Sequence, residues 1–599
     1  MDTQTATFPH LFFKQVNDRQ QQIALRRKNY GIWNRISWQQ YGQMVQEAAA
    51  ALISIGLEPG DRVAILGDNR PEWLICHLAT MTIGCVTCGI YSTSAPEQLA
   101  FVAGHSESRV LFAENEEQVD KILQIMPGLN IEIVVVWEPK GLWGFSHEKI
   151  IFYDEFCARG KAFLQDHPRS VQQRMDAIDP RDTAMMIYTS GTTGRPKGAM
   201  ISHDNILSIT DSFTSVVPMR SDDEVLSYLP LAHIYENVMS VFQAIWNGST
   251  VNFVESIDTL AKNLKEVSPT LFGSVPRIWE KFASMIEIRM SDSTLVKKAL
   301  YRIAVDIGLR YIKSEKGGWR RFGYSLMYWP LYALVLYHLK RQLGLERIRY
   351  AICAAAPASP ELFEFFNALG IPLREAYGQT ESTGIIAVQR IDRPSWGFVG
   401  EPIPNVDVKI AKDGEILARG PGVFKGYYKS PELTTETIKD GWLHTGDVGA
   451  LDNGFLKILD RKKDILITAG GKNITPAFIE NKLKFSSYIQ DAVVIGDGRK
   501  FLVALILIDE DNVTKYAQDN RVPFTTFADL TQNAEILKLI NAEVLKVNKT
   551  LAKPETIKKF ALLPRRLYEE DGDVTPTKKV KRAFLEKRYA DLIEHLYRG

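Results

Sequence analysis

The sequence lacks the marks of several protein classes. It contains five cysteines in 599 residues, which is too few for a disulfide framework. Its first residues show no basic segment followed by an apolar one, so no secretory signal is predicted and we expect a cytoplasmic protein. It also has no uninterrupted apolar run of about 18 residues or more, so a transmembrane helix is not expected.

An excess of charge of one sign is also missing. The chain has 72 Lys and Arg against 71 Asp and Glu, a net charge of +1, and this balance predicts no nucleic-acid partner. Hydrophobic residues make up 45% and charged residues 24%, as in ordinary globular proteins, which excludes disordered and collagen-like chains. At roughly 150 residues per domain, the length predicts about four structural units.

Short apolar runs alternate with helical patterns along most of the chain. The runs at 63–66, 111–113, 133–136 and 184–188 predict buried strands. Pro71, in the segment 68–72, marks the start of a helix. This alternation predicts an α/β fold with parallel sheets.

The residue composition of the sequence changes near residue 460. The stretch 414–459 is rich in glycine and strand-like, and the charged run Asp460–Asp464 that follows is typical of a surface linker. The remainder has a strand-like run at 501–508 and helical patterns after it. We therefore predict an N-terminal domain over 1–460 and a C-terminal domain over 461–599, with a hinge at 460–464.

The segment 319–341 places aromatic and apolar residues between two basic clusters. One interpretation is peripheral contact with a membrane, with the rings at headgroup level and the cations towards phosphate. The other is a helix packed in the core whose basic end reaches solvent. We prefer the packed helix and keep membrane contact as the alternative.

The strongest chemical signal is the segment Tyr188–Gly198. Three glycines and four hydroxyl residues follow a strand-like run, so backbone N–H groups can face a phosphate chain, and Lys197 adds a positive charge. It is not a Walker A loop, because Pro196 stands where that loop has glycine. A plain Gly/Thr surface turn fits this composition less well.

Two further clusters carry groups suited to a nucleotide. In Tyr377–Ser382, Tyr377 offers a ring for a base and Glu381 a hard oxygen ligand for Mg²⁺, although a surface turn is an equally good interpretation of this hexapeptide alone. In 442–448, Asp447 can accept hydrogen bonds from ribose hydroxyls, with Arg461 nearby. The alternative is an ordinary surface Asp–Arg pair.

A fourth segment, Asp571–Arg582, carries lysines that could reach a developing charge, although by itself a solvated basic face is the simpler interpretation. Cys85 and Cys88 form a Cys-x-x-Cys pair without a second pair, so we predict a buried strand and no structural metal.

Taken together, these four segments resemble the adenylate-forming superfamily of acyl-CoA synthetases, adenylation domains and luciferases. The resemblance covers about residues 8–590. Four features are similar to the long-chain fatty acyl-CoA synthetase branch, namely 229–236, 274–280, 460–464 and 575–582, and the insert at 290–345 suits it. The resemblance implies a large N-terminal domain of α/β subdomains with a small β-barrel-like subdomain, and a small mobile α+β C-terminal domain.

Carried over position by position, the resemblance implies a complete set of site residues. ATP or AMP is bound by Thr189, Ser190, Gly191, Thr192, Thr193, Gly194, Lys197, Ala355, Ala356, Glu375, Ala376, Tyr377, Asp447 and Lys463. The implied catalytic residues are Lys579, Glu381, Thr380, His233 and Arg461, with Ser190 and Glu381 as Mg²⁺ ligands. CoA passes Gly470 and Gly471, and the acyl tunnel is lined by Phe272, Ser274 and Gly384.

The resemblance also assigns roles within this set. Tyr377 stacks on adenine, Asp447 binds the ribose hydroxyls, and Lys463 is the pivot of the rotating small domain. Lys579 reaches the carboxylate and α-phosphate, with Lys578 as the alternative. The sequence departs from the family pattern in having Ala354–Ala356 where glycine is more usual.

The implied activity is the activation of long-chain fatty acids by ATP through an acyl-adenylate, followed by transfer to CoA. Alternatives are a fatty acyl-AMP ligase that loads a carrier protein, a ligase for medium-chain, very-long-chain or other carboxylates, and a membrane-associated protein that traps fatty acids. A fatty acyl-AMP ligase usually has an insertion near the hinge, which is absent between Gly441 and Gly471. The resemblance further implies Mg²⁺ as cofactor and allows a homodimer.

Overall fold

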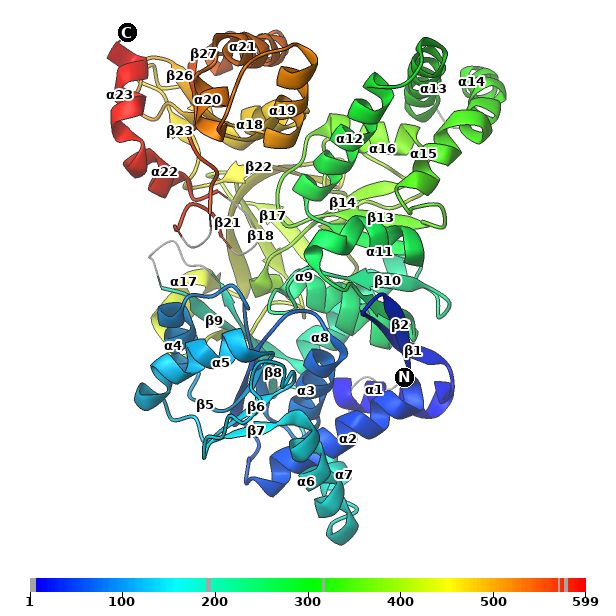
Figure 1. Cartoon of the computed structure of the whole chain (residues 1–599), viewed down its shortest axis with the longest axis vertical. Coiled ribbons are helices and arrows are strands. Elements are labelled where there is room, and N and C mark those ends of the chain that lie inside the picture. The colour runs from blue at the N-terminus through cyan, green and yellow to red at the C-terminus, as the bar shows by residue number, and fades with distance from the viewer. Residues whose placement is uncertain (1–6, 190–194, 315–317, 569–570, 576–579, 599) are drawn as a thin grey trace.

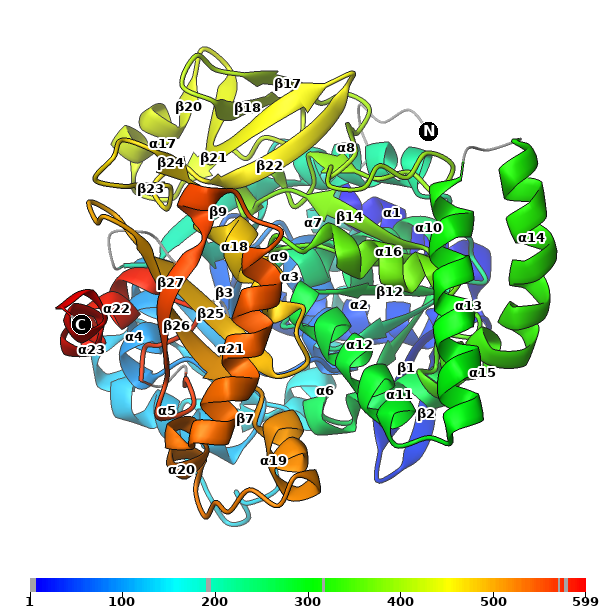
Figure 2. The same ribbon diagram turned by 90° about the horizontal axis from the view of Figure 1, so that it is seen from above.

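The computed structural model describes residues 7–189, 195–314, 318–568, 571–575 and 580–598. Two large mixed sheets and a smaller sheet form the body of the molecule, and the C-terminal part sits above them in Figure 1. Helices flank the sheets on both sides (Figures 1 and 2).

The first large sheet has eight strands. The strands β3 to β8 pair parallel with one another, whereas β9 pairs antiparallel with both β8 and β19. Its order is β19 (Gly426–Tyr427), β9 (Lys197–Ser202), β8 (Thr183–Thr189), β4 (Val86–Ile90), β3 (Arg62–Leu66), β5 (Ser108–Ala113), β6 (Ile133–Val136) and β7 (Ile150–Phe152). The central strands are almost entirely buried, as strands covered on both faces must be.

The second large sheet has nine strands with a parallel centre and antiparallel edges. Its order is β16 (Glu401–Pro402), β15 (Ala387–Val388), β14 (Leu373–Tyr377), β13 (Tyr350–Cys353), β12 (Leu271–Ser274), β10 (Glu224–Ser227), β11 (Thr250–Phe253), β1 (Ile23–Asn29) and β2 (Ile32–Ser37). The loops after β10, β12, β13 and β14 carry many of the predicted site residues.

The helices of this part either flank the two large sheets or form an arm at one edge of the molecule (Figure 2). They are α1 (Phe8–Arg19), α2 (Trp38–Ser54), α3 (Pro71–Thr82), α4 (Pro96–His105), α5 (Glu116–Ile125), α6 (Tyr153–Asp166), α7 (Ser170–Asp176), α8 (His203–Val216), α9 (Ile234–Glu236), α10 (Gln243–Asn247), α11 (Leu260–Val267), α12 (Pro276–Ser291), α13 (Leu295–Lys313), α14 (Trp319–Leu331), α15 (Tyr337–Gln342) and α16 (Pro360–Ala368). Two π-helical turns, Asn237–Phe242 and Tyr332–Leu336, lie between α9 and α10 and between α14 and α15.

The smaller sheet and the C-terminal part complete the chain. The sheet contains β17 (Asp407–Ile410), β18 (Glu415–Arg419), β20 (Ile438–Lys439), β21 (Trp442–Asp452) and β22 (Phe455–Arg461), with α17 (Pro431–Thr437) beside it. After it come β23 (Leu466–Ile467), β24 (Asn473–Ile474), α18 (Pro476–Lys484), β25 (Ile489–Ile495), β26 (Leu502–Ile508), α19 (Glu510–Asp519), α20 (Phe527–Gln532), α21 (Ala534–Asn548), β27 (Ile557–Leu562), α22 (Arg582–Arg588) and α23 (Ala590–Arg598).

The structure confirms the predicted α/β fold. The four apolar runs form β3, β5, β6 and β8, and α3 begins at Pro71. Cys85 and Cys88 are buried at β4, as predicted, and burial raises the pKa of both thiols to about 12. A separate apolar core spans residues 466–562, although the domain boundary at 460 itself stays a prediction.

The segment 319–341 forms a helical arm at one edge of the molecule (Figure 2). One face packs as predicted, with Tyr328 stacked on Tyr311 and Leu336 buried. The expectation that its basic end reaches solvent is wrong for Lys340, which is buried and donates to the carbonyl oxygen of Gly370. Among the helices that the structure describes, none is both long and apolar enough to cross a bilayer.

Candidate active site

The segment Tyr188–Gly198 lies in a β-hairpin. β8 and β9 pair antiparallel, and Thr189 stands opposite Lys197 at the end where the connecting segment joins the two strands. The Lys197 ammonium lies 5.6 Å from the ring centre of Tyr427, a residue on the neighbouring β19. The hairpin therefore places Lys197 beside Tyr427 at the edge of the first large sheet. The predicted phosphate-binding residues Ser190, Gly191, Thr192, Thr193 and Gly194 lie outside the described residues.

Asp447 is the buried centre of a polar cluster. The Tyr377 hydroxyl donates to Asp447 Oδ2 at 2.6 Å, and Arg461 Nε lies 2.9 Å from Oδ1. Asp447 is 6% exposed while the Arg461 side chain is 49% exposed, so this pair is buried on its carboxylate side only. The carboxylate raises the pKa of Arg461, and burial together with Asp447 raises the pKa of Tyr377.

Sheet register explains how these three residues meet. Asp447 on β21 and Arg461 on β22 are directly paired in the antiparallel ladder, so their side chains share one face. Tyr377 is the last residue of β14 in the second large sheet, where it pairs with Ala387. The cluster thus joins two sheets, and its members come from positions 70 and 14 residues apart.

Glu381 lies next to this cluster in a short 3₁₀ turn, Thr380–Ser382. Its Oε1 accepts a hydrogen bond from the Tyr427 hydroxyl at 2.6 Å, and its backbone oxygen accepts from the Phe424 amide. Tyr427 therefore contacts both Glu381 and Lys197. The sequence analysis did not identify Tyr427 as a site residue. Its place beside Glu381 and Lys197 depends on the pairing of β19 with β9, which the sequence alone does not show.

The predicted adenine-binding residues end two neighbouring parallel strands. Ala354–Ala356 follow β13 and Glu375–Tyr377 end β14, which pairs with β13. Ala355 has φ of 70°, a left-handed conformation that suits glycine, which is the residue that the resemblance leads us to expect there. Burial raises the pKa of Glu375 to about 8.

His233 ends the loop between β10 and α9. Its Nδ1 accepts from the backbone N–H of Tyr235 at 3.2 Å and so caps α9. The predicted tunnel residue Ser274 lies nearby in the fold, because Tyr228, at the start of this loop, donates to its hydroxyl at 2.6 Å.

The other two predicted tunnel residues are closely packed. Phe272 is buried against Tyr228 and Trp279. Gly384 has no room for a side chain, because an added Cβ would lie 2.8 Å from Val238.

The predicted hinge joins β22 to the C-terminal part. Asp460 Oδ2 accepts from the Ala477 amide at the start of α18, so its carboxylate links the two parts. Lys463 is exposed at the surface, but partial burial of its ammonium group lowers its pKa. The positive charges of Arg461 and Lys197 lower the pKa of Lys463 further. Lys463 therefore lies towards the Lys197 side of the site.

Gly470 and Gly471 form the exposed turn of the β23–β24 hairpin. Among the described residues, no hydrogen bond or ion pair joins them to the Asp447 cluster. Lys578 and Lys579 lie outside the described residues. The flanking residues Val574 and Val580 form an antiparallel bridge.

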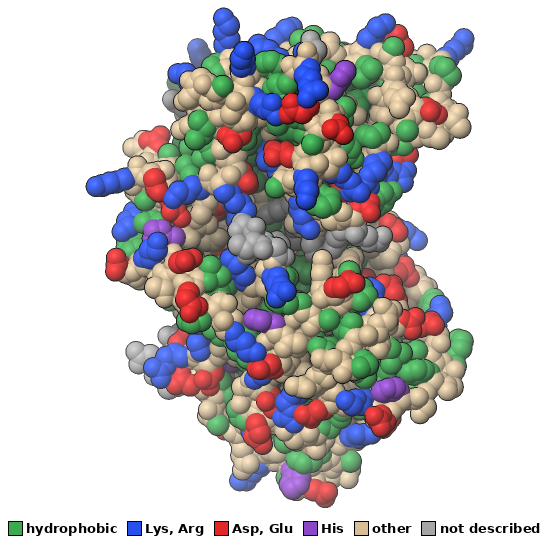
Figure 3. All heavy atoms as spheres, turned by 90° about the vertical axis from the view of Figure 1, so that its left-hand side faces the viewer, with side chains coloured by type: hydrophobic (Ala, Val, Ile, Leu, Met, Phe, Trp, Pro, Cys, Tyr) green, Lys and Arg blue, Asp and Glu red, His purple; other side chains and the backbone are tan. Residues whose placement is uncertain are grey.

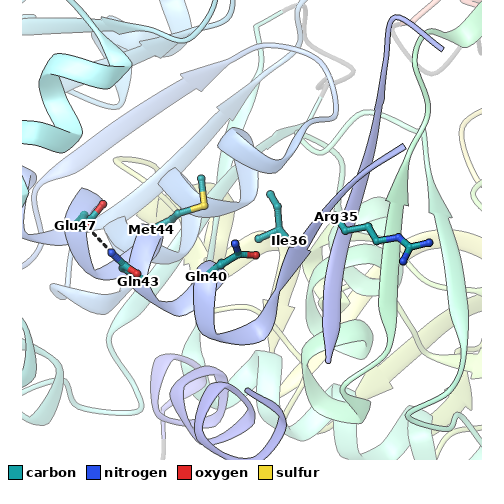
Figure 4. Close-up of a pocket in the computed structure, with 6 residues that line it drawn as sticks. All are labelled: Arg35, Ile36, Gln40, Gln43, Met44 and Glu47. Atoms are coloured by element: carbon teal, nitrogen blue, oxygen red, sulfur yellow. Dashed lines mark hydrogen bonds between the residues drawn. The ribbon is translucent and has the colours of Figure 1, made fainter. Parts of the chain in front are cut away.

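Seen in space-filling view, the molecule is hollowed between its upper C-terminal part and its lower part, and Lys and Arg side chains border the hollow (Figure 3). A separate cavity of about 260 Å³ lies elsewhere, between β2 and α2 (Figure 4). It is lined by Arg35, Ile36, Gln40, Gln43, Met44 and Glu47, none of which is a predicted site residue.

The family comparison agrees with this geometry. Residues 12–428 match the family described as AMP-binding enzyme, and residues 463–599 match the AMP-binding enzyme C-terminal domain. The chain belongs to the AMP-binding enzyme family. The adenylate-forming resemblance inferred from the sequence is thereby confirmed.

Relatives and solved structures match over nearly the whole chain. The long-chain-fatty-acid–CoA ligase FadD15 of Mycobacterium bovis is 33% identical over 98% of this chain and 96% of its own length. The human long-chain-fatty-acid–CoA ligase ACSBG2 is 32% identical over 99% and 92%, respectively.

Two solved structures share the fold. The adenylation domain of a carboxylate reductase from Mycobacterium chelonae has a TM-score of 0.74 at 20% identity, covering 99% of this chain and 91% of that one. The anthranilate CoA ligase AuaEII, solved with anthranoyl-AMP, has a TM-score of 0.73 at 17% identity and covers both chains fully.

Proposed function

We propose that this member of the AMP-binding enzyme family is an ATP-dependent long-chain fatty acid–CoA ligase. The observation that carries the proposal is the Tyr377–Asp447–Arg461 cluster around the buried Asp447 carboxylate, with Glu381 and Lys197 beside it. The full-length relatives named long-chain-fatty-acid–CoA ligase support the choice of acid and thiol.

The reaction needs positioning and charge neutralisation more than a protein nucleophile. The fatty acid carboxylate attacks the α-phosphorus of ATP and pyrophosphate leaves, which gives an acyl-adenylate. The CoA thiol then attacks the acyl carbonyl, and AMP leaves. Two anions meet in the first step, so positive charge from Lys197 and Lys579 lowers its barrier.

The predicted site residues that the structure describes have the following roles in this scheme. Asp447 accepts hydrogen bonds from the ribose hydroxyls, for which a carboxylate held by Tyr377 and Arg461 is already oriented. Thr380 donates to the α-phosphate, and His233 lies beside the fatty acid carboxylate. Lys463 serves as the pivot of the C-terminal part.

The donor chemistry fits a Mg²⁺ ion. Mg²⁺ prefers oxygen ligands and is usually held by one or two carboxylates together with substrate phosphates. Glu381 supplies a carboxylate whose Oε1 is oriented by Tyr427, and Ser190 is the second proposed ligand. The bound ion supplies positive charge to the triphosphate.

The helical arm supports peripheral contact with an anionic membrane surface. Trp319, Phe322, Leu326 and Trp329 are all exposed and recur at steps of three and four, so they share one face of α14. Exposed Arg320 lies at one end, and no Asp or Glu occurs from 318 to 345. Aromatic rings with flanking cations suit a headgroup layer. The homodimer stays a prediction of the resemblance.

The proposal is tested by measuring AMP and pyrophosphate release with a ladder of fatty acids, with and without CoA. We expect CoA-dependent AMP release that peaks with long chains. Pyrophosphate release with trapped acyl-adenylate and no response to CoA would identify a fatty acyl-AMP ligase instead. No turnover with any fatty acid would reject the proposal.

A further inference from the structure

The loop Tyr228–His233, between β10 and α9, is held by an unusual number of buried polar contacts. Asn69, which follows β3 in the first large sheet, reaches across to this loop in the second. Its Nδ2 donates to the Leu229 carbonyl oxygen at 2.6 Å, and its Oδ1 accepts from the Leu231 amide at 3.2 Å. One amide side chain therefore fixes two backbone groups of the loop.

Glu236, at the end of α9, anchors the other side of the loop. It is 3% exposed, and its Oε1 accepts from the Ser227 hydroxyl at 2.7 Å and from the Ser240 hydroxyl at 2.5 Å. Asn69 Nδ2 lies 3.5 Å from the same oxygen. A buried carboxyl group that accepts several hydrogen bonds restricts the groups around it to one arrangement.

The network continues to the backbone of His233. Asn237 Nδ2, in the turn after Glu236, donates to the Leu231 carbonyl at 2.5 Å and lies 3.4 Å from the His233 carbonyl. On the outer side, Ala232 approaches β4 so closely that a Cβ on Gly89 would lie 2.9 Å from its Cα. The loop has little freedom to move while these contacts hold.

We propose that Asn69 and Glu236 are positioning residues that hold His233 at the fatty acid carboxylate by fixing the loop Tyr228–His233 between the two large sheets. This inference rests on the proposed function, because it needs a fatty acid beside His233. Neither residue touches the substrate. Their loss misplaces His233, so it weakens use of the fatty acid and leaves ATP binding at Asp447 unchanged.

The test compares Asn69→Ala, Asn69→Asp and Glu236→Ala with Asn252→Ala as matched control. Asn252 is fully buried and, like Asn69, donates to a backbone carbonyl, that of Val225. It lies on β11, and its hydrogen bonds go to Glu224 and Val225 on β10 and not to the loop. Asn69→Asp keeps the shape and the Oδ1 acceptor while it removes the Nδ2 donor. Asn69→Asp therefore replaces the alanine variants in the test if these fail to fold.

The readouts are KM for a long-chain fatty acid, KM for ATP, and kcat. We expect each Asn69 variant and Glu236→Ala to raise the fatty acid KM about tenfold, as a lost buried hydrogen bond does, with the KM for ATP unchanged. Glu236→Gln keeps the Oε1 acceptor and should recover most of the loss.

Two outcomes would overturn the inference. The first is a fatty acid KM that rises no more in these variants than in Asn252→Ala. The second is an equal rise in both KM values, since that is the result of a general structural role. Absence of fatty acid turnover in the unaltered protein would instead reject the proposed function, and the inference with it.

Discussion

At the scale of single residues, Asp447 organises the site. Its two oxygens are engaged by Tyr377 and Arg461 before any ligand binds, so the carboxylate has one orientation. The sequence predicted Asp447 and Arg461 as partners. It predicted Tyr377 only as a ring for adenine, because the bond between its hydroxyl and Asp447 depends on the contact of two sheets.

The first prediction concerns Asp447. Asp447→Ala removes the acceptor of the ribose hydroxyls, and two charge-assisted hydrogen bonds contribute about 3 kcal/mol. We expect ATP affinity to fall about a hundredfold in calorimetric titration. Tyr377→Phe keeps the ring and loses only the orienting bond, so its effect should be at most about tenfold. Equal ATP affinity in the protein and Asp447→Ala would exclude Asp447 from the nucleotide site.

The second prediction concerns Glu375 and pH. Burial raises the pKa of this carboxyl from 4.5 to about 8. The folded state then holds a proton that the unfolded state releases, so the stabilising effect of protonation is complete below pH 4.5 and is lost as pH rises to about 8. Glu375→Gln, which is always neutral, should flatten this part of the stability profile, as measured by denaturant unfolding from pH 5 to 9. An unchanged slope would show that Glu375 ionises normally.

At the scale of secondary structure elements, the sequence predicted the strands of the β8–β9 hairpin better than it predicted the packing of the α14–α15 arm. The buried strands could be predicted from the sequence because strands covered on both faces consist almost entirely of apolar residues. The arm mixes aromatic, apolar and basic residues, so its sequence alone could not separate core packing from membrane contact. The structure shows packing through Tyr328 and Leu336 and a solvent-exposed row that includes Trp319 and Trp329.

The third prediction is a test of this exposed row. Replacing Trp319, Phe322 and Trp329 together by serine should abolish co-sedimentation with vesicles that contain phosphatidylserine, because the rings supply the buried apolar area. Activity towards fatty acid in detergent solution should remain. The control is Trp143→Ser, which removes an equally exposed tryptophan elsewhere, at 81% exposure. Binding that persists in the triple variant, or weakens equally in the control, would contradict the proposal.

At the scale of the whole molecule, the C-terminal part contacts the N-terminal part through a few polar pairs. Asn512 Nδ2 donates to the Ser284 hydroxyl at 2.7 Å, Lys482 pairs with Glu361 at 3.2 Å, and Lys515 pairs with Asp292 at 3.1 Å. Partly exposed pairs of this kind contribute about 0–1 kcal/mol each. Weak contacts of this kind can break and re-form as the C-terminal part moves between the two half-reactions.

The fourth prediction uses this interface. Ser284→Cys with Asn512→Cys, joined by a short thiol cross-linker, should fix the present arrangement. We expect acyl-adenylate formation, followed by pyrophosphate release, to continue while CoA-dependent AMP release stops. The same double variant without cross-linker is the control and should run both steps. Full CoA-dependent turnover after cross-linking would show that the C-terminal part need not rotate.

The family and the α/β fold could be predicted from the sequence because contiguous motifs such as Tyr188–Gly198 carry them. Contacts between distant segments could not. The Tyr427–Glu381 bond needs the β19–β9 pairing, and the Asn69 contacts need two sheets side by side. Glu236 lies within the segment 229–236 that the sequence analysis named. Only the structure shows that its carboxyl group is buried and hydrogen-bonded to hydroxyl groups.

The most direct test of the account is a crystal structure of the protein with a long-chain acyl-adenylate analogue. We expect the ribose hydroxyls on Asp447, the adenine between Ala354–Ala356 and Tyr377, and the acyl carbonyl beside His233. Clear density for the analogue at any other place, with Asp447 still bonded only to Tyr377 and Arg461, would contradict the central claim that this cluster is the nucleotide site.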